Sequence, residues 1–252
     1  MGFCRLLVAA GTGCGSRTFR LTRSILSAER WIMAKGSKMR INVGCGATPT
    51  DGWLNFDNSL TIRLARWPGV TRVLEVFNLR GGKASWLGRI ANDSDIRFAD
   101  VTVRIPCANQ SAEVIYSSHM IEHLDRSGVQ VFLAEIKRVL QPGGIIRLAA
   151  PDLALLVQRY QTTGNADDLV AGMHMSMDRP VGIASRAKLA LVGPRHHLWM
   201  YDGASLTRLL AAAGFTDIAI MPPGQTRIPD PGSLNLAERV DESVYIEAFR
   251  PE

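Results

Sequence analysis

The chain has 252 residues, 46% of them hydrophobic and 21% charged, a balance typical of a globular protein with one sizeable core. No apolar run approaches the roughly 20 residues of a membrane-spanning helix, so we expect no membrane span. The net charge of +6 lies in residues 1–38, which hold seven basic residues and one acidic residue. The remainder carries 22 of each sign, which argues against a nucleic-acid partner.

Residues 1–38 are expected to be a basic extension, separate from a single domain over residues 39–252. Three explanations stay open for the extension: a disordered segment, a targeting peptide rich in Arg and Ser, or translation that starts at Met33 or Met39. The four cysteines, at positions 4, 14, 45 and 107, show no metal-binding or disulfide spacing. A reduced, cytoplasmic location fits this pattern best.

Hydrophobic periodicity predicts an alternation of strands and helices along the domain. Strands are expected at 41–43, 54–57, 96–100, 113–118, 145–150, 218–221 and 244–249. Helices are expected at 129–140 and 204–213, with further helical segments inside 59–90 and from about 153 to 177. This alternation predicts an α/β fold with a Rossmann-like, doubly wound, mostly parallel seven-stranded sheet. No helix separates the last two strands, so an antiparallel edge strand is expected.

A glycine turn follows the first predicted strand. Gly44 and Gly46 flank Cys45, and Asp57 closes the second strand. Glycines let the backbone pass close to a ligand, and a carboxylate at this place accepts hydrogen bonds from ribose hydroxyls. Asp57 comes 11 residues after Gly46, whereas a dinucleotide site places its acid about 20 residues on, past a full helix. The spacing argues against NAD and predicts a turn at most between the two strands.

Four segments, in this order, resemble the class I S-adenosylmethionine-dependent methyltransferases, and specifically the type-11 group. They are residues 41–46, 53–57, 113–124 and 135–144. The closing part, with His-Leu-Trp-Met-Tyr at 197–201, Gly214-Phe215 and residues 243–248, also resembles that group. The resemblance covers about residues 39 to 250 and implies S-adenosyl-L-methionine as the cofactor.

The resemblance also implies which residues contact that cofactor. The glycine turn would line its methionine part, Asp57 would hold the ribose, Asp100 and Val101 would meet the adenine, and Ser118 with His119 would lie beneath the sulfonium. Asn42 occupies a position where family members often carry an acid. The full set is Asn42, Gly44, Cys45, Gly46, Asp57, Asp100, Val101, Ser118 and His119.

Candidates for chemistry on the methyl acceptor are His119, His197 and Tyr201. A sulfonium methyl is already activated, so a general base is needed only if the acceptor must lose a proton, and a histidine suits that work near neutral pH. The segment at 196–201 lies where the family places its acceptor-side lid. Alternatively, its aromatic residues pack in the core and its two histidines cap the next helix. The acceptor is expected to be a small molecule or glycan-like.

The sequence His119-Met-Ile-Glu122-His123 matches the H-x-x-E-H pattern of a zinc peptidase family. It follows a buried strand in a nucleotide-binding context, and no third ligand is evident, so we expect no metal. Glu122 and His123 are expected to pack or cap a helix instead. Asp152 is either a ligand contact at a strand end or the N-cap of the following helix.

Three functions are compatible with these patterns. S-adenosylmethionine-dependent methyl transfer is the first. The alternatives are an NAD(P)-dependent Rossmann oxidoreductase and a module that binds S-adenosylmethionine without catalysis. The sequence names neither the acceptor nor the oligomeric state.

Overall fold

The computed structural model describes residues 39–46, 48–59, 96–176, 182 and 196–252. The chain divides into two units, residues 1–37 and 38–252, and every described residue belongs to the second. The basic extension, the helices expected inside 59–90 and the basic loop that ends near residue 194 lie outside the described residues.

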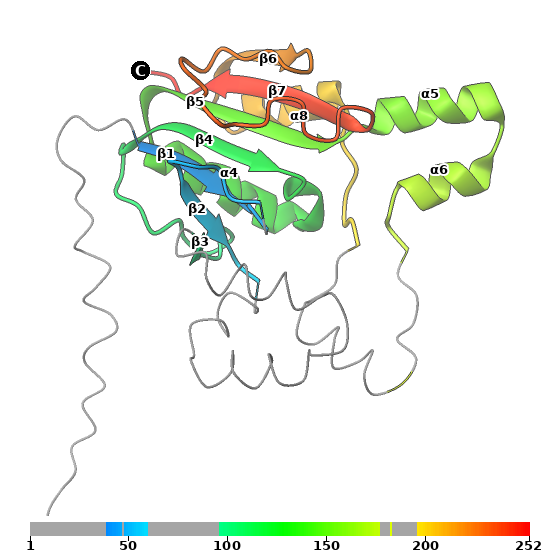
Figure 1. The fold of residues 1–252 in the computed structure, drawn as a ribbon, viewed down its shortest axis with the longest axis horizontal. Helices are drawn as coiled ribbons and strands as arrows, with labels where there is room; N and C mark the ends of the chain where they lie inside the picture. The colour runs from blue at the N-terminus through cyan, green and yellow to red at the C-terminus, as the bar shows by residue number, and fades with distance from the viewer. Residues whose placement is uncertain (1–38, 47, 60–95, 177–181, 183–195) are drawn as a thin grey trace, which may run out of the picture. The chain divides into compact units, whose positions relative to one another are not determined.

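Seven strands form one sheet in the order β3-β2-β1-β4-β5-β7-β6 (Figure 1). The first five in that order are parallel, and β7 is antiparallel to both of its neighbours. The predicted doubly wound sheet is confirmed, and β7 inserts one place in from the edge strand β6. The strands are β1 (Met39–Val43), β2 (Leu54–Asp57), β3 (Ile96–Phe98), β4 (Ala112–Ser118), β5 (Leu140–Pro151), β6 (Thr216–Met221) and β7 (Ser243–Phe249).

Five helical segments belong to the described residues: the 3-10 turn η2 (Ile121–His123), α4 (Arg126–Val139), α5 (Leu153–Thr163), α6 (Ala166–Gly172) and α8 (Gly203–Ala212). The apolar stripe of α4 is buried as its periodicity predicts, and it shares one core with Leu206 and Leu210 of α8. Asp152 caps α5 by accepting a hydrogen bond from Ala154 N. No described helix is both long and apolar enough to cross a membrane.

The strand after α4 begins earlier than the sequence predicts. We expected Gln141-Pro142-Gly143-Gly144 to separate the helix from a strand at 145, but β5 starts at Leu140. Leu140 pairs with Ala112, and Gly143 N donates to Arg250 O at 3.0 Å. Gly143, with φ of 70°, supplies the backbone angle that lets this segment turn and still pair.

The loop between β6 and β7 covers the face of the sheet opposite to α4 and α8. Its Ile228 and Leu234 are buried in a small core with Trp53, Val114 and Tyr116. Because the loop covers this face, we expect a ligand site at the edge of the sheet where the parallel strands have their carboxyl ends.

Arg147 of β5 and Glu247 of β7 are paired in the sheet register and are both fully buried, with Nη1 and Oε1 2.7 Å apart. Arg147 also donates to the carbonyls of Gln225 and Leu236, at 3.0 and 2.9 Å. Glu247 in turn accepts from Arg227 N at 2.8 Å. One ion pair thus fixes both strands and the covering loop.

Asp202 is the N-cap of α8, in a reciprocal capping box with Ser205. Hydrogen bonds from Ser205 hold the pKa of Asp202 below its usual range. A lowered folded-state pKa means that the stabilisation is present above the unfolded pKa of about 3.9 and is lost as the pH falls through the folded value.

Asp202→Ala should therefore lower the free energy of unfolding by about 1 kcal/mol at pH 7, measured by urea denaturation. The difference from the native chain should narrow as the pH falls below about 4. Asp202→Asn is the matched control, because asparagine caps without titrating and should stay near native stability at pH 7. Equal stability of the Ala variant at pH 7 would contradict the assignment.

Candidate functional site

The glycine turn lies at the carboxyl end of β1. The amides of Gly44 and Cys45 both donate to Phe56 O of β2, at 2.8 and 3.2 Å. Gly44 has φ of 72°, and a Cβ there would lie 2.5 Å from Cγ of Met120. The loop after β4 therefore packs directly on this turn, and a side chain at position 44 would separate them.

Asp57 ends β2 beside the turn. Its Oδ2 accepts from Gly46 N at 2.9 Å, and its Oδ1 accepts from Ser59 N at 2.8 Å. A carboxylate offers about four lone-pair positions, so each oxygen retains capacity for one more donor. A Cβ added at Gly46 would meet no atom of the described residues within 4 Å, so these residues leave open space beside the turn.

A hydrogen-bonded loop connects β1 to β2. Asn42 is buried and donates from Nδ2 to Thr50 Oγ1 at 3.0 Å, and Thr50 N donates to Asn55 Oδ1 at 2.8 Å. Cys45 is buried as well, 5% exposed. The described residues of this connection contain no helix, which agrees with the turn predicted from the short spacing. Asn42 thus holds the loop that supports the glycine turn.

Asp100 and Val101, the residues predicted to contact the adenine, follow β3. Ala99 N donates to Asp57 O at 3.1 Å, which places Asp100 next to the end of β2. Asp100 Oδ1 accepts from Thr102 N and Thr102 Oγ1, at 3.0 and 2.6 Å. Val101 is 5% exposed and belongs to the main core. The structure therefore brings Gly46, Asp57 and Asp100 to one edge of the sheet.

His119 follows β4 in a left-handed conformation, with φ of 48°. Its Nε2 lies 2.8 Å from Ser243 Oγ, and its Nδ1 lies 3.3 Å from Nη1 of Arg239. Because a guanidinium only donates, Nδ1 accepts and Nε2–H donates to the serine. The adjacent Ser118 Oγ is buried and has no hydrogen-bond partner among the described residues.

A buried carboxylate lies beneath three imidazoles. The side chain of Glu122 is 1% exposed, and its Oε1 is 3.5 Å from His119 Nδ1 and 3.9 Å from Nε2 of both His123 and His197. Neither carboxylate oxygen has a hydrogen-bond partner among the described residues. Burial lowers the pKa of His197, while the Glu122 charge acts in the opposite direction.

The segment that carries His197 is attached to this cluster through the backbone. Leu198 N and Trp199 N both donate to Glu122 O, at 2.7 and 3.2 Å. Further along, Tyr201 forms an isolated parallel bridge with Asp152 at the end of β5. The histidine pair at 196–197 does not cap α8, because Asp202 does.

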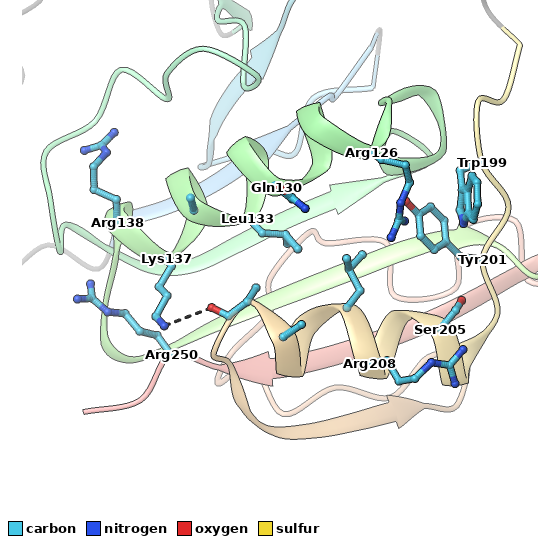
Figure 2. Close-up of a pocket in the computed structure, with 14 residues that line it drawn as sticks. Arg126, Gln130, Leu133, Lys137, Arg138, Trp199, Tyr201, Ser205, Arg208 and Arg250 are labelled. Atoms are coloured by element: carbon cyan, nitrogen blue, oxygen red, sulfur yellow. Dashed lines mark hydrogen bonds between the residues drawn. The ribbon is translucent and has the colours of Figure 1, made fainter.

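Tyr201 and Trp199 lie at one end of a cavity of about 820 Å³ between α4 and α8 (Figure 2). Tyr201 is buried in the main core, whereas Trp199 is 45% exposed, with the Arg126 guanidinium 4.9 Å from its ring centroid. Burial raises the pKa of Tyr201, so its hydroxyl keeps its proton at neutral pH. Five cations also line the cavity: Arg126, Lys137, Arg138, Arg208 and Arg250.

Sequence reasoning missed several contacts of the candidate residues. Met120 against the glycine turn, Ser243 and Arg239 on His119, and the position of His197 against Glu122 all join segments far apart in the chain. The H-x-x-E-H pattern marked Glu122 and His123 in the sequence, but it does not include His197. Its first histidine, however, precedes η2 in a left-handed conformation, so the two histidines do not share a helix face.

Comparison with known proteins identifies the domain that carries this site. The model of a family described as a methyltransferase domain matches residues 41–148, which include the glycine turn, Asp57, Asp100 and the loop after β4. Residues 41–148 thus form a methyltransferase domain of the class I S-adenosylmethionine-dependent type. The predicted family is therefore confirmed.

The chain is 28% identical over 133 residues to a protein named probable methyltransferase PMT1, from Arabidopsis thaliana. That match covers 51% of the chain and 20% of the relative, so the chain spans about a fifth of the relative's length.

Among solved structures, the chain resembles an S-adenosylmethionine-dependent methyltransferase from Methanosarcina mazei, with 12% identity and a TM-score of 0.45 over 86% of this chain and 94% of that one. A second is the S-adenosylmethionine-dependent methyltransferase SibL, with 15% identity and a TM-score of 0.40 over 85% and 51% of the two chains.

Proposed function

We propose that this methyltransferase binds S-adenosyl-L-methionine at the carboxyl edge of β1, β2 and β3 and transfers its methyl group to a small-molecule or glycan-like acceptor. The observation that carries the proposal is the carboxylate of Asp57. It is oriented by Gly46 N and Ser59 N, keeps hydrogen-bonding capacity on both oxygens, and adjoins the open space beside the glycine turn.

The residues around that carboxylate have distinct roles in the proposal. Gly44, Cys45 and Gly46 border the methionine part, while Asp100 and Val101 follow β3 on the adenine side. Asn42 acts through the loop that it holds by Thr50. Ser118 and His119, at the end of β4, would lie beneath the sulfonium.

Chemistry at this site requires alignment more than activation. The protein holds the acceptor atom in line with the methyl group and the sulfur, and it excludes water while the transfer proceeds. His119 is oriented for contact with the acceptor by Ser243 and Arg239. His197 and Tyr201, on the segment paired with η2 and β5, complete the acceptor side.

Calorimetry with S-adenosylhomocysteine and with NADH tests the cofactor. We expect the first ligand to bind and the second to give no heat of binding. Binding of NADH alone would overturn the proposal in favour of an oxidoreductase. A screen of acceptors with a labelled methyl donor then tests catalysis, and binding without any labelled product would favour a non-catalytic module.

Two glycine variants test where the cofactor lies. Gly46→Ala and Gly224→Ala each place a side chain at positive φ, 57° and 75°, with no atom within 4 Å of the new Cβ. Each should lose about 1 kcal/mol of unfolding free energy to backbone strain, measured by urea denaturation.

Only Gly46→Ala should also weaken S-adenosylhomocysteine binding, by at least about tenfold, because its Cβ enters the proposed ligand space while Gly224 lies in the loop after β6. Equal affinity of the two variants would place the cofactor elsewhere.

A further inference from the structure

The described residues around the buried Glu122 side chain compensate its carboxylate poorly. Its side chain is 1% exposed, and neither oxygen accepts a hydrogen bond from any described residue. An ionised carboxylate removed from water costs several kcal/mol unless it is paired or coordinated to a metal. The nearest groups are imidazole nitrogens 3.5 to 3.9 Å away, which is too far for hydrogen bonds.

The orientation of His123 prepares one of its nitrogens to coordinate a metal. Its Nδ1 lies 3.1 Å from the carbonyl oxygen of His196, so Nδ1 carries the proton and donates it. Nε2 then holds a lone pair, and this atom is the one that approaches Glu122, at 3.9 Å. A ligating histidine almost always donates its other N–H to a carbonyl or carboxylate in this way.

His197 completes the group from a distant part of the chain. Its Nε2 is also 3.9 Å from Glu122 Oε1, and its side chain is 9% exposed. Backbone hydrogen bonds hold it there independently of the side chains, since Leu198 N donates to Glu122 O and His197 N donates to His174 O, at 2.7 and 2.9 Å. His197 is therefore the third candidate ligand, which the sequence pattern alone did not reveal.

The three ligand atoms have a spacing suited to one metal ion. One atom each from Glu122, His123 and His197 all lie within 4.8 Å of one another. A tetrahedral zinc ion with bonds of about 2.0–2.2 Å holds neighbouring ligand atoms about 3.3–3.6 Å apart, so small side-chain rotations close the group. Two histidines and one glutamate are a ligand set of catalytic zinc sites, which keep the fourth position for water.

We propose that Glu122, His123 and His197 bind one divalent zinc-type metal ion on the acceptor side of the cofactor edge. The side chain of His123 is 34% exposed, whereas those of Glu122 and His197 are nearly covered, so the ion enters past His123. In this arrangement His197 is a metal ligand, and His119, 3.5 Å from Glu122, lies beside the site without completing the ligand group.

Titration of the full-length, chelator-treated protein with Zn²⁺ tests the site, and Co²⁺ absorption reports its tetrahedral geometry. The native chain should bind one ion at this site, with visible Co²⁺ bands. Glu122→Gln and His197→Ala should each weaken Zn²⁺ binding by at least about 100-fold. His196→Ala is the matched control and should bind like the native chain, because its ring is outside the ligand group.

Circular dichroism checks that each variant is folded. If a variant with a buried substitution fails to fold, His123→Ala, at the more exposed ligand, gives the same test. Absence of stoichiometric Zn²⁺ binding by the native chain would overturn the proposal, and so would native affinity in all three ligand variants. The measurement is of metal binding, so it stands apart from the result of the S-adenosylhomocysteine and acceptor experiments.

Discussion

Replacing Arg147 by methionine should lower the free energy of unfolding by about 3–5 kcal/mol, measured by guanidinium denaturation. The substitution leaves the carboxylate of Glu247 fully buried without its nearest charge partner at 2.7 Å, so that only the partly exposed Arg227, with Nε 3.4 Å from Oε2, remains among the ion-pair partners in the described residues. It also removes the donors to Gln225 O and Leu236 O, which attach the loop between β6 and β7 to the sheet. The loss should therefore be far larger than for an exposed ion pair, whose usual contribution is about 0–1 kcal/mol.

The double variant Arg147→Met/Glu247→Leu is the control that separates charge burial from packing. Replacing a buried ion pair by apolar residues of similar size is often neutral or stabilising, so most of the lost stability should return. A single variant that loses less than about 1 kcal/mol would show that the remaining partners of Glu247, including Arg227 N, satisfy it without the arginine.

Much of the fold follows from local patterns in the sequence. The period of apolar residues places α4, and the Pro-Gly-Gly sequence after it predicts where the helix ends. The missing helix before β7 predicts the antiparallel pairing. The start of β5 was missed because propensity favours a loop at Gln141 to Gly144, whereas pairing with β4 and hydrogen bonds to Arg250 extend the strand.

The site is predictable only where its parts are neighbours in the sequence. Gly46 of the turn and the carboxylate of Asp57 are 11 residues apart, and this spacing limits their geometry. His197 and Glu122 meet only because residues 198 and 199 pair with the backbone after β4. Nothing in local propensity encodes that pairing, and the positive φ of His119 is equally a product of its tertiary setting.

Replacing Asp57 by alanine should weaken S-adenosylhomocysteine binding by at least about 100-fold in calorimetry. Each hydrogen bond to a charged acceptor contributes about 1.5–3 kcal/mol, and the two oxygens retain capacity for two ribose hydroxyls. Loss of both interactions converts to roughly 10²–10⁴-fold in affinity. The variant also releases Gly46 N and Ser59 N, which loosens the turn that borders the cofactor.

Asp51→Ala is the matched control, because Asp51 is an exposed carboxylate in the same β1–β2 connection, and only its backbone carbonyl accepts a described bond, from Ser233 Oγ. It should bind S-adenosylhomocysteine like the native chain. That result would show that the loss of one negative charge does not by itself cause the weaker binding of Asp57→Ala. Native affinity in Asp57→Ala would mean that the ribose lies away from β2. Equal losses in both variants would instead point to long-range electrostatics, which salt titration identifies because screening weakens them.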